Sequence, residues 1–204
     1  MKKQLLSLCL ILCFFWQNGL AQNPKHEFRA TWLATVANID WPKTKATDAT
    51  TRNQQKKELT DIFDKMVAGN MNAVCMQVRS LCDAMYQSSY EPWSVALTGT
   101  RGKDPGYDPL AFAIEEAHKR GLELHVWVNP FRASTGDLAN TDPVWKNAGD
   151  WLIKYNNDSF KGYIIDPGHP EARAYVVKVL MEIVNKYDVD GIVMDDYFYA
   201  YGGT

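Results

Sequence analysis

Four runs of apolar residues along the chain alternate with three stretches whose apolar residues repeat at helical spacing. Each run has the length and composition of a buried β-strand, and together they cover residues 28–36, 73–79, 122–129 and 191–197. The first helical stretch, residues 53–68, places its apolar positions on one face, and these are Leu59, Ile62, Phe63, Met66 and Val67.

The second and third helical stretches carry their own start signals. Asp108 and Pro109 supply an N-cap and a first-turn proline for a helix that ends at Arg120, before Gly121. Pro170 opens the third helix, whose apolar stripe consists of Val176, Val179, Leu180, Ile183, Val184 and Tyr187. The alternation of strands and helices predicts an α/β fold with a parallel sheet and right-handed crossovers.

The connections between these elements differ in length according to their direction. The links from a helix to the next strand are short, and they cover residues 69–72, 121 and 188–190. The links from a strand to the next helix are long, and they cover residues 37–52, 80–107 and 130–169. Long loops at the C-terminal ends of parallel strands are where barrel enzymes build their active sites. We expect the last of these loops to carry a short helix of its own around residues 144–154.

The turn after the first strand decides between two parallel-sheet architectures. A nucleotide-binding sheet would need a glycine-rich phosphate loop there, and residues 37–42 contain no glycine. Because a closed barrel needs about 250 residues, we predict the N-terminal half of a (β/α)8 TIM barrel, truncated after the fourth strand. Such a half-barrel has an unpaired strand at each edge. We expect a fragment of a longer protein; the alternative is a dimer that completes a barrel.

Alternation along each strand sorts its side chains into a helix side and an axis side. Arg29 and Thr31 are the predicted inward pair of the first strand. The other strands are predicted to send these polar and aromatic residues to the axis side: Gln77, Arg79, His125, Trp127, Asn129, Asp195 and Tyr197. Asp196 should point away unless the strand has already turned. The pattern predicts a site with a carboxylate, a guanidinium, an amide and aromatic walls.

Each of these candidates has a structural interpretation beside the functional one. Arg79 fits a structural partner for a carboxylate as well as a substrate clamp, and Trp127 fits core packing as well as a sugar platform. His125 is more often a hydrogen-bonded interior histidine than a catalyst. Asp195 favours a functional role, because a carboxylate at the mouth of a barrel strand costs desolvation energy unless it is used or paired.

Residues 1–21 have the pattern of a secretory signal peptide, with Lys2 and Lys3 before an apolar run and a small-residue cleavage site. The run of about 12 residues is shorter than the roughly 20 that span a bilayer. We therefore expect a secreted or periplasmic cell-envelope protein, with residues 22–204 as its domain and no membrane span after cleavage. Without residues 1–21 the chain keeps 20 basic and 24 acidic residues and no basic stripe, which argues against nucleic acid as a partner.

Two cysteines follow the signal pattern, and no motif for cofactor chemistry accompanies them. A strand separates Cys75 from Cys82 by an extended step that is too long for a disulfide, so we expect free thiols. The sequence has no His-Glu-x-x-His, no paired Cys-x-x-Cys and no Gly-x-Ser-x-Gly elbow. We therefore predict no metal and no cofactor.

Motifs along nearly all of the mature chain match those of a known family in order and spacing. They lie at residues 28–32, 38–42, 77–79, 83–86, 92–94, 97–99, 107–110, 115–118, 120–123, 125–132, 166–168 and 188–199. In these motifs the chain resembles the glycosyl hydrolase-like family 10 domain of bacterial secreted and envelope proteins. It departs from the family pattern at Val193 and Met194, where a histidine and a bulky apolar residue are expected.

The resemblance implies a (β/α)8 barrel that acts on an oligo- or polysaccharide. Some members of the family are linked to hydrolysis of peptidoglycan strands stripped of their peptides. The resemblance also implies that Asp195 or Asp196 lies where related barrel glycosidases keep a catalytic carboxylate, at the end of the fourth strand. The family's remaining strands are absent from this sequence.

Glycoside hydrolysis normally needs two carboxyl groups across the scissile bond. We expect Asp195 to be the nucleophile or base, with its acid partner on a strand after residue 204 and Asp83 as a weaker candidate. The predicted substrate-binding residues are Arg79, Asp83, Tyr86, His125, Trp127, Asn129, Arg132 and Tyr197. Among them, Tyr86, Trp127 and Tyr197 are expected to stack on sugar rings, and Arg79, His125 and Asn129 to hold sugar hydroxyls. The alternatives are a non-catalytic glycan-binding barrel and an inactive truncated product.

Overall fold

The computed structural model describes residues 27–139, 142, 144, 146, 149–157 and 161–195. Its centre is a four-stranded parallel sheet in the order β1-β2-β3-β7. The strands are β1 (Ala30–Leu33), β2 (Ala73–Arg79), β3 (Glu123–Val128) and β7 (Gly191–Met194). The predicted α/β class with a parallel sheet is therefore confirmed.

Three long helices connect these strands, namely α2 (Ala49–Ala68), α4 (Pro109–His118) and α6 (Pro170–Lys186). α2 begins four residues earlier than the apolar pattern predicts, because Asp48 forms a capping box with Thr51. The amide of Thr51 donates to Asp48 Oδ1 at 2.8 Å, and the amide of Asp48 donates to Thr51 Oγ1 at 3.0 Å. Asp108 caps α4 by accepting from the Ala111 amide, as its sequence position predicts.

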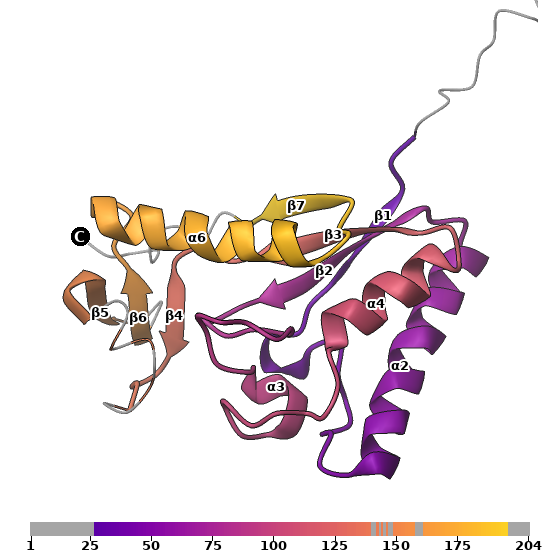
Figure 1. The fold of residues 1–204 in the computed structure, drawn as a ribbon, viewed down its shortest axis with the longest axis horizontal. Helices are drawn as coiled ribbons and strands as arrows, with labels where there is room; N and C mark the ends of the chain where they lie inside the picture. Colours follow the sequence, from indigo (N-terminus) through magenta and orange to yellow (C-terminus); the bar gives the residue numbers. More distant parts are fainter. Residues whose placement is uncertain are drawn as a thin grey trace, which may run out of the picture.

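The main core lies between the sheet and helices α2 and α4, which pack side by side (Figure 1). The helix-side residues of the strands are fully buried there, among them Val74, Met76, Leu124 and Val126. α6 buries Val179 and Ile183, and Ile183 belongs to the same core. Val184, which was expected in this stripe, is 47% exposed, because it lies one position off the buried face of the helix.

The first strand corrects the predicted assignment of its faces. β1 pairs Thr31 with Val74 and Trp32 with Cys75, so Thr31 belongs to the helix side and Trp32 to the axis side. The amide of Arg29 donates to Asn72 Oδ1 at 2.8 Å, and the residue lies before the strand begins. The expectation that Arg29 and Thr31 point inward was therefore wrong, because the alternate set of β1 residues, which includes Trp32, faces the axis.

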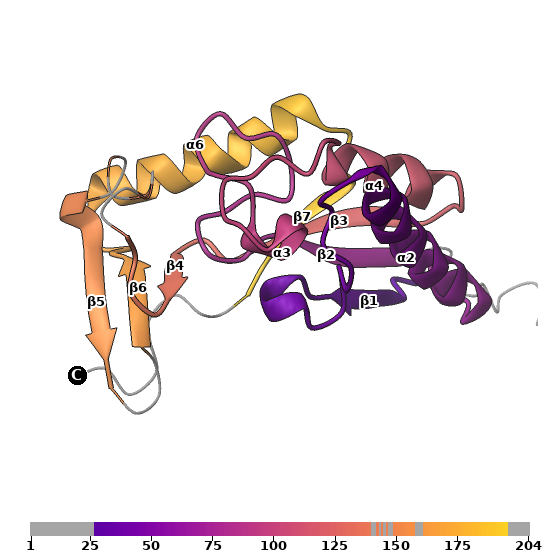
Figure 2. The same ribbon diagram turned by 90° about the horizontal axis from the view of Figure 1, so that it is seen from below.

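A second, smaller sheet occupies the long loop between β3 and α6. It is antiparallel, with the order β4-β6-β5, and consists of β4 (Arg132–Thr135), β5 (Leu152–Asn156) and β6 (Lys161–Ile165). Both views place it at the opposite end of the molecule from α2 and α4, beside the N-terminal part of α6 (Figures 1 and 2). A second apolar cluster anchors it there through Ala133, Ile165 and Ala172.

The helix predicted around residues 144–154 is only partly present. Val144 and Lys146 are helical, but the 3-10 turn η2 (Gly149–Trp151) leads directly into β5. The physical reason is strand pairing: residues 152–156 pair antiparallel with β6, the next strand along the chain, and this pairing overrides the helical pattern. Besides the strands of the small sheet, two short helical elements were not predicted, namely η1 (Val36–Asn38) after β1 and α3 (Val95–Thr98) in the loop after β2. Among the described residues, none of the helices is both long and apolar enough to cross a membrane.

Candidate active site

Asp195 follows the last residue of β7, at the C-terminal edge of the parallel sheet, and both of its carboxylate oxygens accept hydrogen bonds. Trp127 Nε1 donates to Oδ2 at 3.0 Å, and Asn129 Nδ2 donates to Oδ1 at 2.8 Å. These donors come from β3 and from the residue just after it, because β3 and β7 are hydrogen-bonded neighbours. The structure thus brings together three residues that strand alternation had placed on the axis side.

The amide group of Asn129 is held in a single orientation. Its Oδ1 accepts from the amides of Phe131 at 3.2 Å and Arg132 at 2.6 Å, so its Nδ2 is left to face Asp195. Asn129 is fully buried, whereas Asp195 and Trp127 are half-buried. The start of the long loop therefore fixes the donor that holds the carboxylate.

Aromatic rings from β1 and β3 meet over the axis side of the sheet. Trp32 packs edge-to-face on Trp127 with ring centroids 4.7 Å apart, and Phe28 packs similarly on His125 at 5.0 Å. On β2, the small residue Cys75 lies in register between Trp32 of β1 and His125 of β3. Trp32 is 51% exposed, and it was missed because the register of β1 was misassigned. Choosing the aromatic set of that strand as the inward one would have found it.

His125 lies on the axis side but two residues further from the C-terminal edge than Trp127. Its Nε2 contacts Glu123 Oε2 at 2.9 Å. The ring also covers Gly191, where an added Cβ would lie 2.2 Å from His125 Nδ1. A side chain at residue 191 would therefore force the ring to move, so the glycine makes room for the histidine ring on the neighbouring strand. The structure gives no contact between His125 and Asp195.

Of the two roles that the sequence allowed for Arg79, the structure supports the structural one, as the partner of a carboxylate. Its side chain is 1% exposed and forms a bidentate ion pair with Glu91, with Nε to Oε2 at 2.7 Å and Nη2 to Oε1 at 2.6 Å. Its Nη1 donates to the carbonyl of Asn129, and Tyr175 donates its hydroxyl to Glu91. Burial opposes the charge, but the neighbouring Cys82 and Glu91 raise the pKa of Arg79 well above its usual value. Its predicted contact with substrate is therefore corrected to a buried structural role.

Asp83 and Tyr86 are corrected in the same way, because both are buried side chains of the loop after β2. Asp83 Oδ1 accepts from the Ser80 and Leu81 amides, and Oδ2 lies 3.9 Å from Arg101 Nη1. Tyr86 is fully buried on the helix side, edge-to-face with Tyr187, and burial raises the pKa of its hydroxyl. Their burial argues against contact with a sugar ring. The prediction misplaced them because strand alternation does not extend into this loop.

The remaining predicted residues have different outcomes. Arg132 opens β4 next to Asn129 and is half-buried. Asp196 and Tyr197 lie outside the described residues. Cys75 and Cys82 are free and buried, as expected, and burial raises the pKa of Cys82 to about 12. In the part of the chain that the structure describes, no group of three or more acidic, histidine or cysteine side chains could hold a metal ion.

Comparison with known proteins identifies relatives and a shared fold. The chain is 47% identical over 180 residues to Glycosyl hydrolase YngK from Bacillus subtilis, covering 86% of this chain and 34% of that protein. It is 36% identical over 195 residues to Glycosyl hydrolase DigH from Escherichia coli K12, covering 88% of this chain and 44% of that protein. The chain thus spans less than half the length of either relative.

Solved structures match at low identity and therefore inform on the fold alone. An alpha-L-fucosidase from Paenibacillus thiaminolyticus matches with a TM-score of 0.53 at 18% identity, covering 83% of this chain and 23% of that one. A maltogenic alpha-amylase from Thermotoga neapolitana matches with a TM-score of 0.52 at 13% identity, covering 82% of this chain and 39% of that one.

The family comparison tests the prediction made from the motifs. The model of the family described as Glycosyl hydrolase-like 10 matches residues 27–203, which is most of the chain. This match confirms the resemblance read from the sequence, and the two curated relatives are named as glycosyl hydrolases. The chain belongs to the glycosyl hydrolase-like 10 family.

Proposed function

We propose that the protein is a glycoside hydrolase in which Asp195 is the nucleophile or the general base. The observation that carries the proposal is the pair of hydrogen bonds from Trp127 and Asn129 to the two oxygens of Asp195. Both donors are N–H groups that cannot accept, so they suit a carboxylate. Because both donors are uncharged, the negative charge is left to act on a sugar carbon or on a water molecule.

The second carboxyl group of the reaction must act as an acid. Glu91 and Asp83, two buried carboxylates of the loop after β2, do not fit that role, because Glu91 is paired with Arg79 and Asp83 faces Arg101. We propose that the acid is Asp196 or a residue on a strand that follows residue 204 in a longer protein. The spacing of the two groups would distinguish the mechanisms, at about 5–5.5 Å for retention and about 6.5–9.5 Å for inversion.

We propose further that the described residues are the first half of a (β/α)8 barrel and that the chain is a fragment of a longer protein. Both outer strands of the parallel sheet pair on one side only within the described residues. Apolar surface is exposed at each of these edges: Ile192 and Met194 on β7, and Trp32 on β1. A hollow of about 380 Å³ also lies between β1 and α2, lined in part by Thr31, Ile39, Ile62 and Met66. Further βα units would cover these surfaces.

The proposed substrate is a bacterial glycan, and strands of peptidoglycan without peptides fit best with the expected export of the protein. The axis side offers aromatic surface for sugar rings through Trp32 and Trp127. The signal-peptide pattern of residues 1–21 supports a secreted or cell-envelope location, where this glycan is found.

The test is turnover of peptide-free glycan strands by the longest natural form of the protein. Asp195→Asn should lower kcat by about a hundredfold to ten-thousandfold, the usual contribution of a positioned acid–base group. Asp188→Asn is the matched control, because it removes an exposed carboxylate just before the same strand. Full activity of Asp195→Asn would overturn the assignment.

A non-catalytic glycan-binding barrel is the second candidate. It needs the aromatic surface and the amide of Asn129 but no acid, and the described residues place no free acid beside Asp195. Binding of glycan strands that survives the double change Asp195→Asn and Asp196→Asn, with no turnover by the unaltered protein, would favour this candidate.

A further inference from the structure

Both backbone polar groups of Asn129 bond to a single residue, Arg79. The amide of Asn129 donates to the carbonyl oxygen of Arg79 at 2.8 Å, and Arg79 Nη1 donates to the carbonyl oxygen of Asn129. The side chain of Asn129 is also fully used, since its Oδ1 accepts from two loop amides and its Nδ2 donates to Asp195. Arg79 therefore holds the backbone of the residue whose side chain holds Asp195.

A register shift in the parallel sheet explains why the Arg79 side chain is available for this contact. β2 and β3 pair regularly up to Gln77 and Trp127, but Arg79 is then in register with Val128. Val128 belongs to the main core on the helix side of the sheet. The shift thus turns Arg79 away from the axis side that regular alternation predicts, as β-bulges do beside active sites.

The chain after β2 offers no amide to the carbonyl group of Asn129. The amides of Ser80 and Leu81 both donate to Asp83 Oδ1 instead. Asn129 is fully buried, and a buried carbonyl group needs a donor. The guanidinium of Arg79 supplies this donor where the strand ladder has ended.

The buried carboxylate of Glu91 fixes the direction of the guanidinium. Two parallel bonds, from Nε at 2.7 Å and from Nη2 at 2.6 Å, hold the plane of the group, and Nη2 also lies 3.0 Å from Cys82 Sγ. Glu91 in turn accepts from the hydroxyl of Tyr175 on α6 at 3.1 Å. Because a guanidinium is planar and rigid, these bonds also fix the direction of Nη1 toward Asn129.

We propose that Arg79 is a positioning residue for the reaction and that it acts on Asp195 through Asn129. Direct hydrogen bonds run from Glu91 through Arg79 and Asn129 to Asp195. Arg79 is 1% exposed, and Glu91 balances its charge, so it acts through the position of Asn129 rather than by contact with a sugar. Reacting groups must be held within about 0.5 Å of their productive geometry. The inference rests on the proposed function and adds the group that aligns its carboxylate.

The test is a double-mutant cycle on kcat, measured with peptide-free glycan strands and the longest natural form of the protein. Arg79→Lys keeps the buried positive charge but loses the planar fork. We expect kcat to fall about tenfold to a hundredfold, with a change in KM of less than about twofold. In an Asn129→Ala background the same change should lower kcat by less than about twofold, because the donor that Arg79 positions is gone.

A milder variant keeps the test decisive if Arg79→Lys does not fold. Tyr175→Phe removes only the hydroxyl that holds Glu91 and leaves the buried ion pair in place. It should lower kcat several-fold with KM unchanged, and Asn129→Ala should again absorb the effect. Urea unfolding of each variant shows that the assayed protein is folded.

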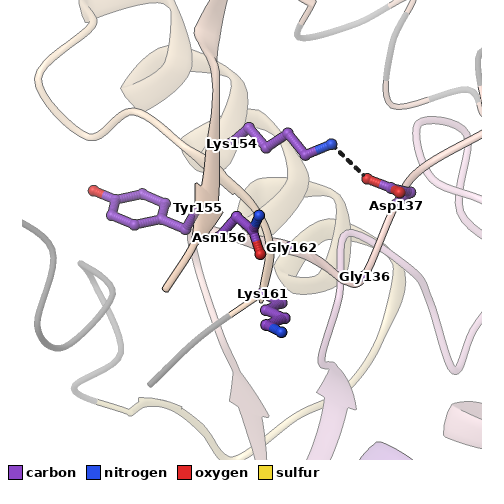
Figure 3. Close-up of a pocket in the computed structure, with 7 residues that line it drawn as sticks. All are labelled: Gly136, Asp137, Lys154, Tyr155, Asn156, Lys161 and Gly162. Atoms are coloured by element: carbon purple, nitrogen blue, oxygen red, sulfur yellow. Dashed lines mark hydrogen bonds and ion pairs between the residues drawn. The ribbon is translucent and has the colours of Figure 1, made fainter. Parts of the chain in front are cut away.

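Two controls break ion pairs that do not touch Asn129 or Asp195. Arg101→Lys disrupts the pair with Asp142, which belongs to another arginine of the loop after β2. Lys154→Ala removes the exposed pair with Asp137, beside a hollow of about 190 Å³ in the small sheet (Figure 3). Both controls should leave kcat and KM unchanged.

The outcomes separate this inference from the proposed function. An equal loss of kcat with and without the Asn129 side chain would overturn the inference, because Arg79 would then act by another route. Unaltered kcat in Arg79→Lys and Tyr175→Phe, together with an inactive Asp195→Asn, would overturn it as well and leave the proposed function standing. Full activity of Asp195→Asn would overturn the proposed function, and this inference with it.

Discussion

Two carboxylates lie near the C-terminal edge of the parallel sheet in opposite surroundings. Glu91 is buried in the loop after β2 and receives both of its N–H bonds from the single guanidinium of Arg79. Asp195 is half-buried and receives its bonds from two uncharged groups, the indole of Trp127 and the amide of Asn129.

This difference separates a structural carboxylate from one that can react. A full positive charge at hydrogen-bond distance neutralises Glu91, so the pair can remain buried and join the loop after β2 to α6 through Tyr175. Uncharged donors orient Asp195 without cancelling its charge. The type of donor therefore distinguishes the two roles better than the position of the carboxylate in the chain does.

The largest expected effect is on the buried pair. Arg79→Met leaves Glu91 buried with Tyr175 but without its cation, so the free energy of unfolding should fall by about 3–5 kcal/mol. Urea unfolding followed by circular dichroism measures this loss. The double change Arg79→Met and Glu91→Leu removes both charges and should recover much of the stability. A loss below about 1 kcal/mol in Arg79→Met would show that the pair is not structural.

The next effect concerns the uncharged donor. Asn129→Asp keeps Oδ1 as the acceptor for the amides of Phe131 and Arg132 but replaces the Nδ2 donor with an oxygen that faces Asp195. We expect kcat to fall about tenfold to a hundredfold with a smaller change in KM, because a hydrogen bond to a charged group contributes about 1.5–3 kcal/mol. Trp127→Phe removes the other donor and should also lower kcat. Unchanged kcat in both variants would exclude Asp195 as the reacting group.

The third prediction concerns the contact between Gly191 of β7 and the ring of His125 on the axis side of the sheet. Gly191→Ala adds a Cβ that would lie 2.2 Å from His125 Nδ1, so it should lower the free energy of unfolding by about 1–3 kcal/mol. In a His125→Ala background the same change should have little effect, because the ring is gone. Thermal unfolding of the four proteins measures the coupling. Additive losses would contradict the contact.

The smallest expected effect is a pH dependence of stability that comes from the buried carboxylate Glu182. Burial would raise the pKa of Glu182, but hydrogen bonds from Lys186, Ser88 and Ser89 lower it below its ordinary value of 4.5. Since the folded pKa is depressed, its contribution to stability is present above pH 4.5 and is lost as the pH falls through the folded value.

Glu182→Gln checks this contribution. It should lower the free energy of unfolding by about 1 kcal/mol at pH 7, and the difference from the unaltered protein should shrink at pH 3. Urea unfolding at the two pH values measures it. A difference that is the same at both values would show that the charge of Glu182 does not stabilise the loop after β2.

The site on the axis side could be predicted from the sequence because strand alternation is a local property. Successive side chains of a strand point to opposite faces, so the apolar positions of β3 were enough to place Trp127 and Asn129 on the axis side. The same reasoning placed Asp195 beside them, since the strands are parallel and end at the same edge. It failed at Trp32, where the polar and apolar residues of a short strand do not alternate clearly.

The sequence by itself therefore determined the order of the four parallel strands and the three long helices, the parallel sheet, and the placement of Trp127 and Asn129 beside Asp195. Only the tertiary structure decided that Arg79 is paired with Glu91, that Tyr86 is buried and that residues 152–156 form a strand. The physical reason is that these outcomes depend on partners brought together by packing. A loop side chain has no fixed direction, and a short strand is stabilised by the neighbour with which it pairs.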